Sequence, residues 1–536
     1  MEAAPSPPLP RPWAAAAASA AVVLAAAALL LPEGASPAGL AAAALVTLAP
    51  GALLAPRRRG RGHFRGRVSD FLLVAPVGLL TLHVYFLAVT GRPSWFYLWL
   101  LRDSAAHEWA GSEGLTPNLG LFVPAGLAMA AAMCVARVGV GVLRNVCFRG
   151  SVYAGAAAVA FALAWLQPPG VGPPTAGPPA EGWERALPVV GGAEPSAAAP
   201  CDTVLVVMES LRADALHPET MPHAWALAGR GLVLAEHHAG ANSSVLGMYG
   251  LLTGKPAAHA AADLAADDPR PPGLLGAAKR AGHRTEWFCG NGSTDGGAFG
   301  RLVGPGRFDR RHTRAHADWA EGDAWALGRL AEALAEPDRP PVFAVVFLVA
   351  THFDYPPPGE ADRRFEPSAP DAALLVPWPE GGAGRRSVLN RYRNAAYAAD
   401  ARLGRFLAGV DLSTTRVAVT GDHGQSLGED GTIGHWSRLS DAQTRVPFVL
   451  AGPGVPAGRV GVTTAHADAA ALLLRVMRGL PVDPDPPPRP TLLVQSNPVG
   501  GTEDWVVLDR GARTGWRRSG GVFRLLGPVD ALGRVR

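Results

Sequence analysis

Short apolar runs alternate with helical stretches from residue 201 onward, and this alternation constrains the fold more than any other feature of the chain. The runs are apolar at nearly every position, which is typical of parallel strands covered on both faces. Helices usually connect such strands. The sequence therefore predicts an α/β domain with a mostly parallel central sheet over residues 201–480. The predicted strands span 203–208, 232–235, 284–289, 342–349 and 416–420, and the predicted helices span 222–230, 274–281, 323–335 and 391–409.

Acidic and histidine side chains follow three of these strands. Glu209 comes directly after the first strand, and His352 comes three residues after the 342–349 strand. Asp422 and His423 follow the 416–420 strand after one glycine. Because ligands of open α/β sheets bind beyond the carboxyl ends of the strands, these side chains are expected to meet at that edge of the sheet, which we call the rim.

A serine opens another helix near this rim. Residues 239–254 read AGANSSVLGMYGLLTG, and the pattern predicts a helix over about 244–252 that begins at Ser244. Backbone N–H groups at a helix N-terminus favour a bound anion, which could be a phosphate or sulfate attacked by the hydroxyl. Alternatively, Ser243 or Ser244 is only an N-cap, since serine is a preferred capping residue.

Each other candidate also has a purely structural interpretation. Glu209 could form an ion pair with Arg212, and Asp422-His423-Gly424 could be only a turn. His352 could likewise serve a turn, and His435 could be a packed surface histidine. Structural and functional interpretations are equally open for His466 and Asp468, whereas packing or surface positions are expected for His217, His237 and His238.

Long apolar stretches occupy the first 166 residues. The first, 13–31, carries no charge and is about long enough to cross a bilayer. A cleaved signal peptide would explain only that one. Residues 1–166 are therefore predicted to form about five transmembrane helices. The other four stretches span 38–55, 70–90, 118–143 and 151–166.

Arginines set the expected orientation of these helices. The loop RRRGRGHFRGR lies between the second and third spans, and Arg144 and Arg149 lie between the fourth and fifth. The positive-inside rule makes both loops cytoplasmic, so everything after residue 166 is predicted to be extracytoplasmic. Residues 167–200 are rich in proline and glycine and are predicted to be a linker.

Charge and cysteine usage exclude some functions. The net charge is only +4, and no groove-reading motif is present, so no nucleic-acid partner is expected. The four cysteines include no CxxC pair, which argues against a disulfide framework and a structural zinc site. A bond between Cys201 and Cys289 is left open, and the oligomeric state is not predicted.

Four ordered segments resemble the sulfatase-like branch of the alkaline phosphatase superfamily. The resemblance covers most of residues 201–480. The segments are VLVVMESLRADAL at 204–216, SSVLGMYGLLTG at 243–254, TGDHGQSLGEDGTIGHWSRLSDAQTRVPFVLAGPG at 420–454 and HADAAALLLRVMRG at 466–479.

The resemblance implies an alkaline-phosphatase-like domain with one divalent metal ion. By position it implies that Glu209, Ser244, Asp422 and His423 bind the metal, which could be manganese, magnesium, calcium or zinc. It also implies that His352 and His435 contact the substrate ester. A multi-pass anchor with an outer catalytic domain resembles lipoteichoic acid synthases and Gram-negative inner-membrane sulfatase-like proteins, which implies a bacterial plasma-membrane location.

Two departures from true sulfatases bear on the substrate. Sulfatases follow the nucleophile with Pro or Ala and then Arg, which directs conversion to formylglycine, whereas here Val245-Leu246-Gly247-Met248 follow. Glu209-Ser210 also stands where sulfatases usually have two aspartates. The sequence therefore predicts a membrane-anchored, metal-dependent hydrolase or transferase that uses an unmodified serine on phosphoesters of lipid headgroups or envelope polymers. The alternatives are a non-catalytic lipid-binding regulator and a sulfuric ester hydrolase.

Residues 481–536 follow a proline-rich stretch and contain three short apolar runs, TLLVQS, WVVLDRG and GVFRLLG. Such runs resemble the small antiparallel sheet that closes domains of this type. This region is therefore predicted to be a C-terminal subdomain that completes the catalytic domain.

Overall fold

A computed structural model provides the structure of the chain. The predicted transmembrane region 1–166 lies outside the described residues, as does the predicted linker except for residues 174–175. None of the described helices combines the length and apolarity needed to cross a membrane. The described residues are 174–175, 201–266, 273–291, 294, 297–316, 318–353, 355, 363–368, 383–429, 432–483, 486–497, 502–519 and 522–536.

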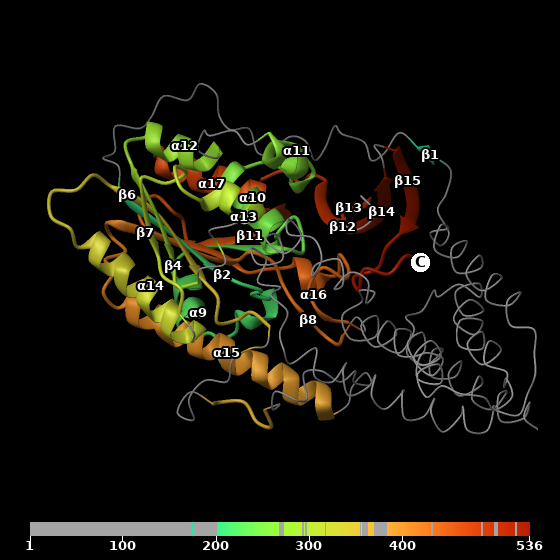
Figure 1. The fold of residues 1–536 in the computed structure, drawn as a ribbon, viewed down its shortest axis with the longest axis horizontal. Coiled ribbons are helices and arrows are strands. Elements are labelled where there is room, and N and C mark those ends of the chain that lie inside the picture. The colour runs from blue at the N-terminus through green and yellow to red at the C-terminus, as the bar shows by residue number, and fades with distance from the viewer. Residues whose placement is uncertain are drawn as a thin grey trace, which may run out of the picture. The chain divides into compact units, whose positions relative to one another are not determined.

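An eight-stranded sheet forms the centre of the domain (Figure 1). Strand β10 pairs antiparallel with both of its neighbours, whereas the other pairs are parallel. The predicted mostly parallel sheet is therefore confirmed. In spatial order the strands are β11 (Gly458–Ala465), β3 (Leu232–His238), β10 (Phe448–Ala451), β7 (Thr415–Gly421), β2 (Asp202–Met208), β6 (Val342–Leu348), β4 (Arg284–Cys289) and β5 (Arg310–Thr313).

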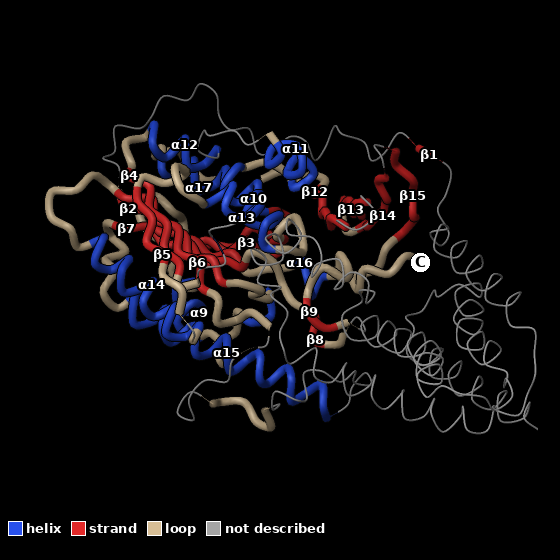
Figure 2. The backbone as a smooth tube through the Cα atoms, viewed as in Figure 1, coloured by secondary structure: helices blue, strands red, loops and turns tan. Residues whose placement is uncertain are grey.

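Helices cover both faces of this sheet (Figure 2). Alternate residues of β2 belong to two separate apolar clusters: Leu205 and Val207 face one helical layer, and Val206 and Met208 face the other. Burial on both faces explains why the strand is apolar throughout. One layer contains α10 (Ser244–Thr253), α11 (Ala260–Ala265), α12 (Gly273–Arg280), α13 (Gly297–Val303) and α17 (His466–Met477), and the other contains α9 (Pro222–Ala228), α14 (Trp319–Leu334) and α15 (Ala383–Leu407).

The five predicted strands are all present, and the structure adds strands that the apolar pattern did not reveal. Two of these, β5 (RRHT) and β11 (GRVGVTTA), form the two edges of the sheet. An edge strand has a neighbour on one side only and keeps more polar residues, so it lacks a continuous apolar run. Cys201 and Cys289 are both free thiols, so the possible bond between them is absent.

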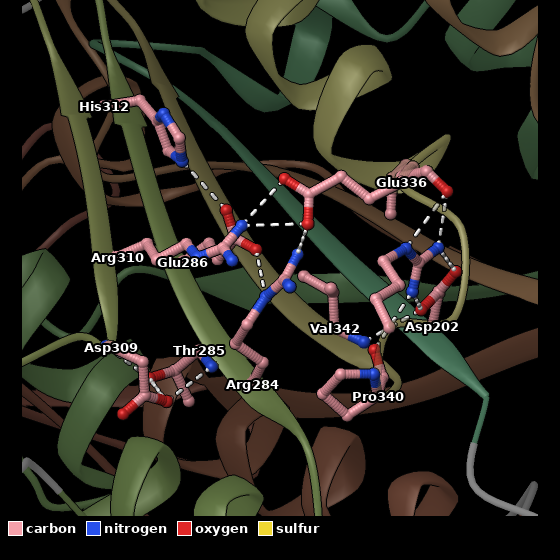
Figure 3. Close-up of polar contacts among 12 residues, drawn as sticks. Asp202, Arg284, Thr285, Glu286, Asp309, Arg310, His312, Glu336, Pro340 and Val342 are labelled. Carbon is pink, nitrogen blue, oxygen red and sulfur yellow. Dashed lines mark hydrogen bonds and ion pairs between the residues drawn. The ribbon is translucent and has the colours of Figure 1, made fainter.

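Ion pairs join charged side chains at the amino ends of the strands (Figure 3). Arg284 Nε lies 2.6 Å from Glu286 Oε1, and Arg284 Nη2 lies 2.9 Å from Glu336 Oε2. Arg310 shares Glu336 at 2.7 Å. Asp202, at the start of β2, contacts Arg339 Nη2 at 2.6 Å. Each of these cations therefore has a carboxylate partner.

A smaller antiparallel sheet contains the C-terminal residues and confirms the prediction for this region. Strand β14 was not predicted because ARTGWRRS is strongly charged. Its Arg517 and Arg518 contact Asp504 and Glu503 on the adjacent β13 at 2.6 and 3.1 Å, which explains how a charged strand is accommodated. The spatial order is β1 (Pro174–Thr175), β15 (Val522–Pro528), β14 (Ala512–Ser519), β13 (Thr502–Asp509) and β12 (Thr491–Asn497).

Several short elements lie between the larger ones. They are η1 (Ala213–Ala215), η2 (Ala257–His259), α16 (Asp441–Thr444), β8 (Ser426–Leu427) and β9 (Ile433–Gly434), of which β8 and β9 form a two-stranded sheet.

Close packing of α10 against the end of β7 requires a glycine. A Cβ at Gly247 would lie 1.9 Å from the carbonyl oxygen of Asp422, a distance that no side chain can adopt. Helix α10 therefore approaches the Asp422 backbone more closely than any other residue would allow, and this approach sets the position of Ser244 at the helix start.

We predict that Gly247→Ala destabilises the protein although alanine favours helices. The added methyl group must displace α10 from Asp422, which should lower the free energy of unfolding by about 1–3 kcal/mol. Gly328→Ala is the matched control, because Gly328 is an exposed helical glycine with open space around its Cβ. The control should gain roughly 0.5–1 kcal/mol. Urea titration measures both changes, and equal stabilisation of the two variants would contradict the packing argument.

Candidate active site and metal centre

The predicted rim residues converge because their strands are neighbours. Strand β2 pairs in parallel with both β6 and β7, so the carboxyl ends of these three strands lie side by side. Glu209 follows β2, His352 lies beyond β6, and Asp422 and His423 follow β7. The structure thus brings together side chains that are more than two hundred residues apart in the sequence.

Ser244 lies within this group. It is buried, and its Oγ lies 3.1 Å from Oε1 and 3.1 Å from Oε2 of Glu209. The same oxygen lies 3.1 Å from Nε2 of His423. Ser243, rather than Ser244, occupies the N-cap position of α10 and makes no capping bond with its side chain. The N-cap interpretation of Ser244 is therefore wrong, because the hydroxyl faces the rim.

Two carboxylates and one imidazole form a compact buried cluster. One ligand atom each from Glu209, Asp422 and His423 lies within 4.8 Å of the others. Nε2 of His423 is 3.2 Å from Glu209 Oε1 and 3.6 Å from Asp422 Oδ2. Asp422 Oδ1 accepts from the backbone N–H groups of Ser210 and His423, each at 2.8 Å. Oδ2 of Asp422 is buried and has no hydrogen-bond partner among the described residues.

A second group overlaps the first through Glu209. One ligand atom each from Glu209, His352 and His435 also lies within 4.8 Å of the others. The rings of His423 and His435 have centroids 4.2 Å apart, and those of His352 and His435 are 5.7 Å apart. All six predicted site residues therefore belong to one buried constellation.

The three histidines share one orientation. Nδ1 of His423 contacts the carbonyl of Gly424 at 2.7 Å, and Nδ1 of His352 contacts the carbonyl of Phe353 at 2.5 Å. Nδ1 of His435 contacts Oε1 of Gln425 at 2.8 Å. Because these oxygens can only accept, each Nδ1 carries the hydrogen, and each neutral ring keeps its lone pair on Nε2. This is the tautomer that an Nε2 metal ligand or proton acceptor requires.

The electrostatics of the cluster favour positive charge at Nε2 of His423. Burial alone would raise the pKa of Glu209, but the hydrogen bond and charge of His423 hold it below the usual range. Burial and the charge of Glu209 raise the pKa of Asp422 well above its ordinary value. Although burial lowers the pKa of His423, the two carboxylates raise it to about 9. Nε2 of His423 is thus placed to hold a positive charge between two acids.

The donor set fits a divalent cation. Among the described residues, no lysine or arginine pairs with Glu209 or Asp422, and Oδ2 of Asp422 lacks a hydrogen-bond partner. Two carboxylates, one imidazole Nε2 and a serine hydroxyl form a hard, oxygen-rich set. A cation at this position would satisfy the orphaned oxygen and replace the proton of His423.

Arg212 does not compensate Glu209, so that alternative is wrong. Its guanidinium forms two 2.8 Å hydrogen bonds with the carboxylate of Asp214 and also contacts Glu429. It donates to the carbonyl of Gln425 at 2.7 Å as well. Arg212 therefore fixes the segment that follows His423. It forms no ion pair with Glu209 among the described residues, so Glu209 is available to the site.

The remaining candidates, four histidines and Asp468, have supporting, packing or surface positions. His466 Nε2 donates to the carbonyl of Asp422 at 3.3 Å, and its Nδ1 lies 3.0 Å from Nε2 of the buried His237. Burial lowers the pKa of His466 to about 3, so this ring is a neutral support for the Asp422 backbone. Asp468 accepts from Ala465 N at 2.7 Å and caps α17. His238 is buried and His217 is exposed, as expected for packing and surface positions.

Two supporting residues were missed. Gln425 bonds His435 through Oε1 and donates from Nε2 to the Tyr355 hydroxyl at 2.7 Å. Asp323 on α14 accepts from Val349 N at 2.7 Å and from Ala350 N at 3.0 Å. Two sequence features could have indicated these roles. Gln425 comes just after Asp-His-Gly, and Asp323 is an acid on the apolar face of α14.

Asp323 fixes the loop that carries His352. In addition to the two hydrogen bonds that Asp323 accepts, Thr351 donates from Oγ1 to the carbonyl of Glu209 at 2.5 Å. Burial raises the pKa of Asp323 to about 7 although both N–H groups favour the carboxylate. The loop is therefore tied at one end to α14 and at the other to the first residue after β2.

We predict that Asp323→Asn loosens this loop. An asparagine offers one acceptor oxygen, and its NH₂ group would face the second backbone N–H, leaving a buried donor without a partner. Hydrogen exchange of residues 349–353, followed by mass spectrometry, should become roughly tenfold faster or more. Glu321→Gln, an exposed change on the same helix, is the control. Unchanged exchange in Asp323→Asn would show that the carboxylate does not hold the loop.

Comparisons with known proteins identify a family for this part of the chain. The sulfatase family model matches residues 202–480, just over half of the chain. A comparison with curated proteins gives no match.

Solved structures are similar at low identity. The phosphonate monoester hydrolase of Agrobacterium radiobacter is 17% identical with a TM-score of 0.46, over 61% of this chain and 88% of that chain. The C-terminal periplasmic domain of EcEptC from Escherichia coli, in complex with zinc, is 19% identical with a TM-score of 0.43, over 54% and 84%. The soluble domain of lipooligosaccharide phosphoethanolamine transferase A from Neisseria meningitidis is 19% identical with a TM-score of 0.41, over 53% and 90%.

The family match spans all six candidate residues and the strands that position them. The sequence motifs had predicted the same assignment. The chain therefore belongs to the sulfatase family of enzymes.

Proposed function

We propose that the protein is a metal-dependent hydrolase or transferase of phosphoesters with Ser244 as its nucleophile. The observation that carries this proposal is the position of the Ser244 hydroxyl, 3.1 Å from both oxygens of Glu209 and 3.1 Å from Nε2 of His423. A serine hydroxyl is a weak nucleophile unless a base or a cation lies next to it. Here both kinds of group converge on one oxygen.

The first step transfers the phosphoryl group to the enzyme. Ser244 Oγ attacks phosphorus, its proton passes to Glu209, and the ester P–O bond breaks. The helix N-terminus at Ser244 stabilises the charge that develops on the non-bridging oxygens. A divalent cation held by Glu209, Ser244, Asp422 and His423 would lower the pKa of the hydroxyl and neutralise substrate charge.

His352 and His435 serve the leaving group in this proposal. Both rings present Nε2 toward Glu209, because Nδ1 of each is committed to an oxygen acceptor. A protonated Nε2 can give its proton to the departing oxygen, and a neutral ring can accept one from the incoming water or hydroxyl. The second attack breaks the bond to Ser244 Oγ and returns the serine. Water as acceptor gives hydrolysis, and an alcohol gives transfer.

Phosphoesters are favoured over sulfate esters by the residues after Ser244. The segment Val245-Leu246-Gly247-Met248 contains no Pro or Ala followed by Arg, the pattern that directs formylglycine formation, so the nucleophile stays a serine in this proposal. The substrate class follows from the predicted membrane anchor. A site held near the outer face of a plasma membrane would meet lipid headgroups or envelope polymers, and we propose these as substrates.

An activity panel tests this function. The full chain, purified in detergent, is assayed with an aryl phosphodiester, an aryl phosphomonoester and an aryl sulfate, each with added manganese or with EDTA. We expect phosphoester turnover that EDTA abolishes and metal restores. Ser244→Ala should lower the rate roughly a thousandfold or more, because it removes the attacking atom.

Ser243→Ala is the matched control, because the neighbouring serine is equally buried and makes no capping bond with its side chain. Its rate should stay close to that of the natural chain. Turnover that survives in Ser244→Ala would remove the nucleophile assignment. No turnover of any ester, together with no retained metal, would favour the non-catalytic lipid-binding regulator.

A further inference from the structure

A cavity lies at the amino ends of the central strands, on the edge of the sheet opposite to the catalytic rim. Its lining includes Cys201 and Asp202 at the start of β2, Thr414 and Arg416 at the start of β7, and Gly454 after β10. Its volume is about 790 Å³. Since a water molecule takes about 30 Å³ in the liquid, this space admits a phosphoryl group with its substituents.

A buried guanidinium faces this cavity with most of its donors unused. Arg416 is 6% exposed, and among the described residues its guanidinium makes one hydrogen bond, from Nε to the carbonyl of Pro453 at 2.7 Å. Within the described part of the chain, its buried Nη1 has no hydrogen-bond partner. A buried cation without compensation is costly, so its presence points to a partner that the described residues do not supply.

The neighbouring cations of this edge make the contrast clear. Arg284 pairs with Glu286 and Glu336 (Figure 3). Arg339 donates from both Nη1 and Nη2 to the carboxylate of Asp202. Asp202 is the acid that lines the cavity, and it is already neutralised by Arg339 and bonded by Val342 N. No described carboxylate forms an ion pair with Arg416.

The charge of Arg416 also affects the pKa values of neighbouring groups. Burial raises the pKa of the Cys201 thiol, and the positive charge of Arg416 acts in the opposite direction. Burial lowers the pKa of His283, and Arg416 lowers it further. Burial lowers the pKa of Arg416 itself. The cavity is therefore electropositive at its buried end.

We propose that this cavity binds a small tetrahedral oxyanion of the phosphate class through the guanidinium of Arg416. The planar, forked guanidinium of an arginine matches two oxygens of a phosphoryl group, and Nη2, which has no hydrogen-bond partner among the described residues, is the nitrogen available to the cavity. Thr414 and Ser413 line the same cavity and give it a polar edge. The anion is either free phosphate or the phosphate of a lipid headgroup, since both offer the same oxygens. This site is separate from Ser244 and does not depend on the proposed function.

The test measures how phosphate shifts the thermal unfolding midpoint of the full chain. All variants carry Ser244→Ala and are kept in EDTA, so any phosphate response of the catalytic rim is the same in each. Phosphate should raise the midpoint, because a ligand that binds only the folded state stabilises it. Arg416→Met should raise the concentration for half of this effect at least tenfold. Arg524→Met, which removes an exposed arginine of β15 outside the cavity lining, is the charge control and should keep the response.

Each result decides the proposal. Retention of the full response in Arg416→Met, or no response in the parent chain, overturns it. If Arg416→Met does not fold, Arg416→Lys is used, since it keeps the charge without the fork and should weaken the response. sn-Glycerol 3-phosphate is titrated in parallel as a soluble headgroup. A lower half-effect concentration for it than for inorganic phosphate indicates a lipid source, and the reverse indicates free phosphate.

Discussion

Two carboxylates buried beside one imidazole are the constraint on which this site depends. Glu209 and Asp422 are both almost fully buried, and Nε2 of His423 lies between them. Buried acids at this separation repel each other, so the arrangement persists with a proton on one of them or with positive charge among them. The imidazole can supply that charge, and so can a divalent cation. The Ser244 hydroxyl touches the same atoms, which couples the nucleophile to the charge balance of the cluster.

The rest of the fold holds the side chains of this cluster in position. Parallel pairing of β2 with β6 and β7 brings three loops to one rim, and the bonds from Asp323 and Thr351 fix the loop before His352. On the opposite side of the cluster, Gly247 lets α10 lie against the carbonyl of Asp422, which also receives His466. The polar groups are therefore supported from both helical layers, as a preorganised site requires.

Local patterns predicted five strands and the rim, because these depend on short apolar runs and on the polar residues directly after each run. His435 follows no such run and was identified only through the family resemblance. Edge strands β5 and β11 could not be predicted this way, since each is covered less and reads as polar. Asp323 and Gln425 were also missed. Their partners are a backbone turn and a tyrosine hydroxyl that only tertiary folding brings near. The burial of Arg416 was likewise not predicted, because an arginine at a strand start usually faces water.

Covalent transfer of the phosphoryl group to Ser244 is the step on which the proposed function rests, and peptide mass spectrometry can detect it. The full chain is mixed with manganese and an aryl phosphodiester, quenched in acid within its first turnovers, and digested. We expect the peptide containing Ser244 to gain the mass of the transferred group, fragmentation to place this mass on Ser244, and EDTA to prevent the gain. A substrate that is consumed while the Ser244 peptide stays unmodified at every quench time, or that leaves its phosphoryl group on another residue, would contradict the covalent mechanism.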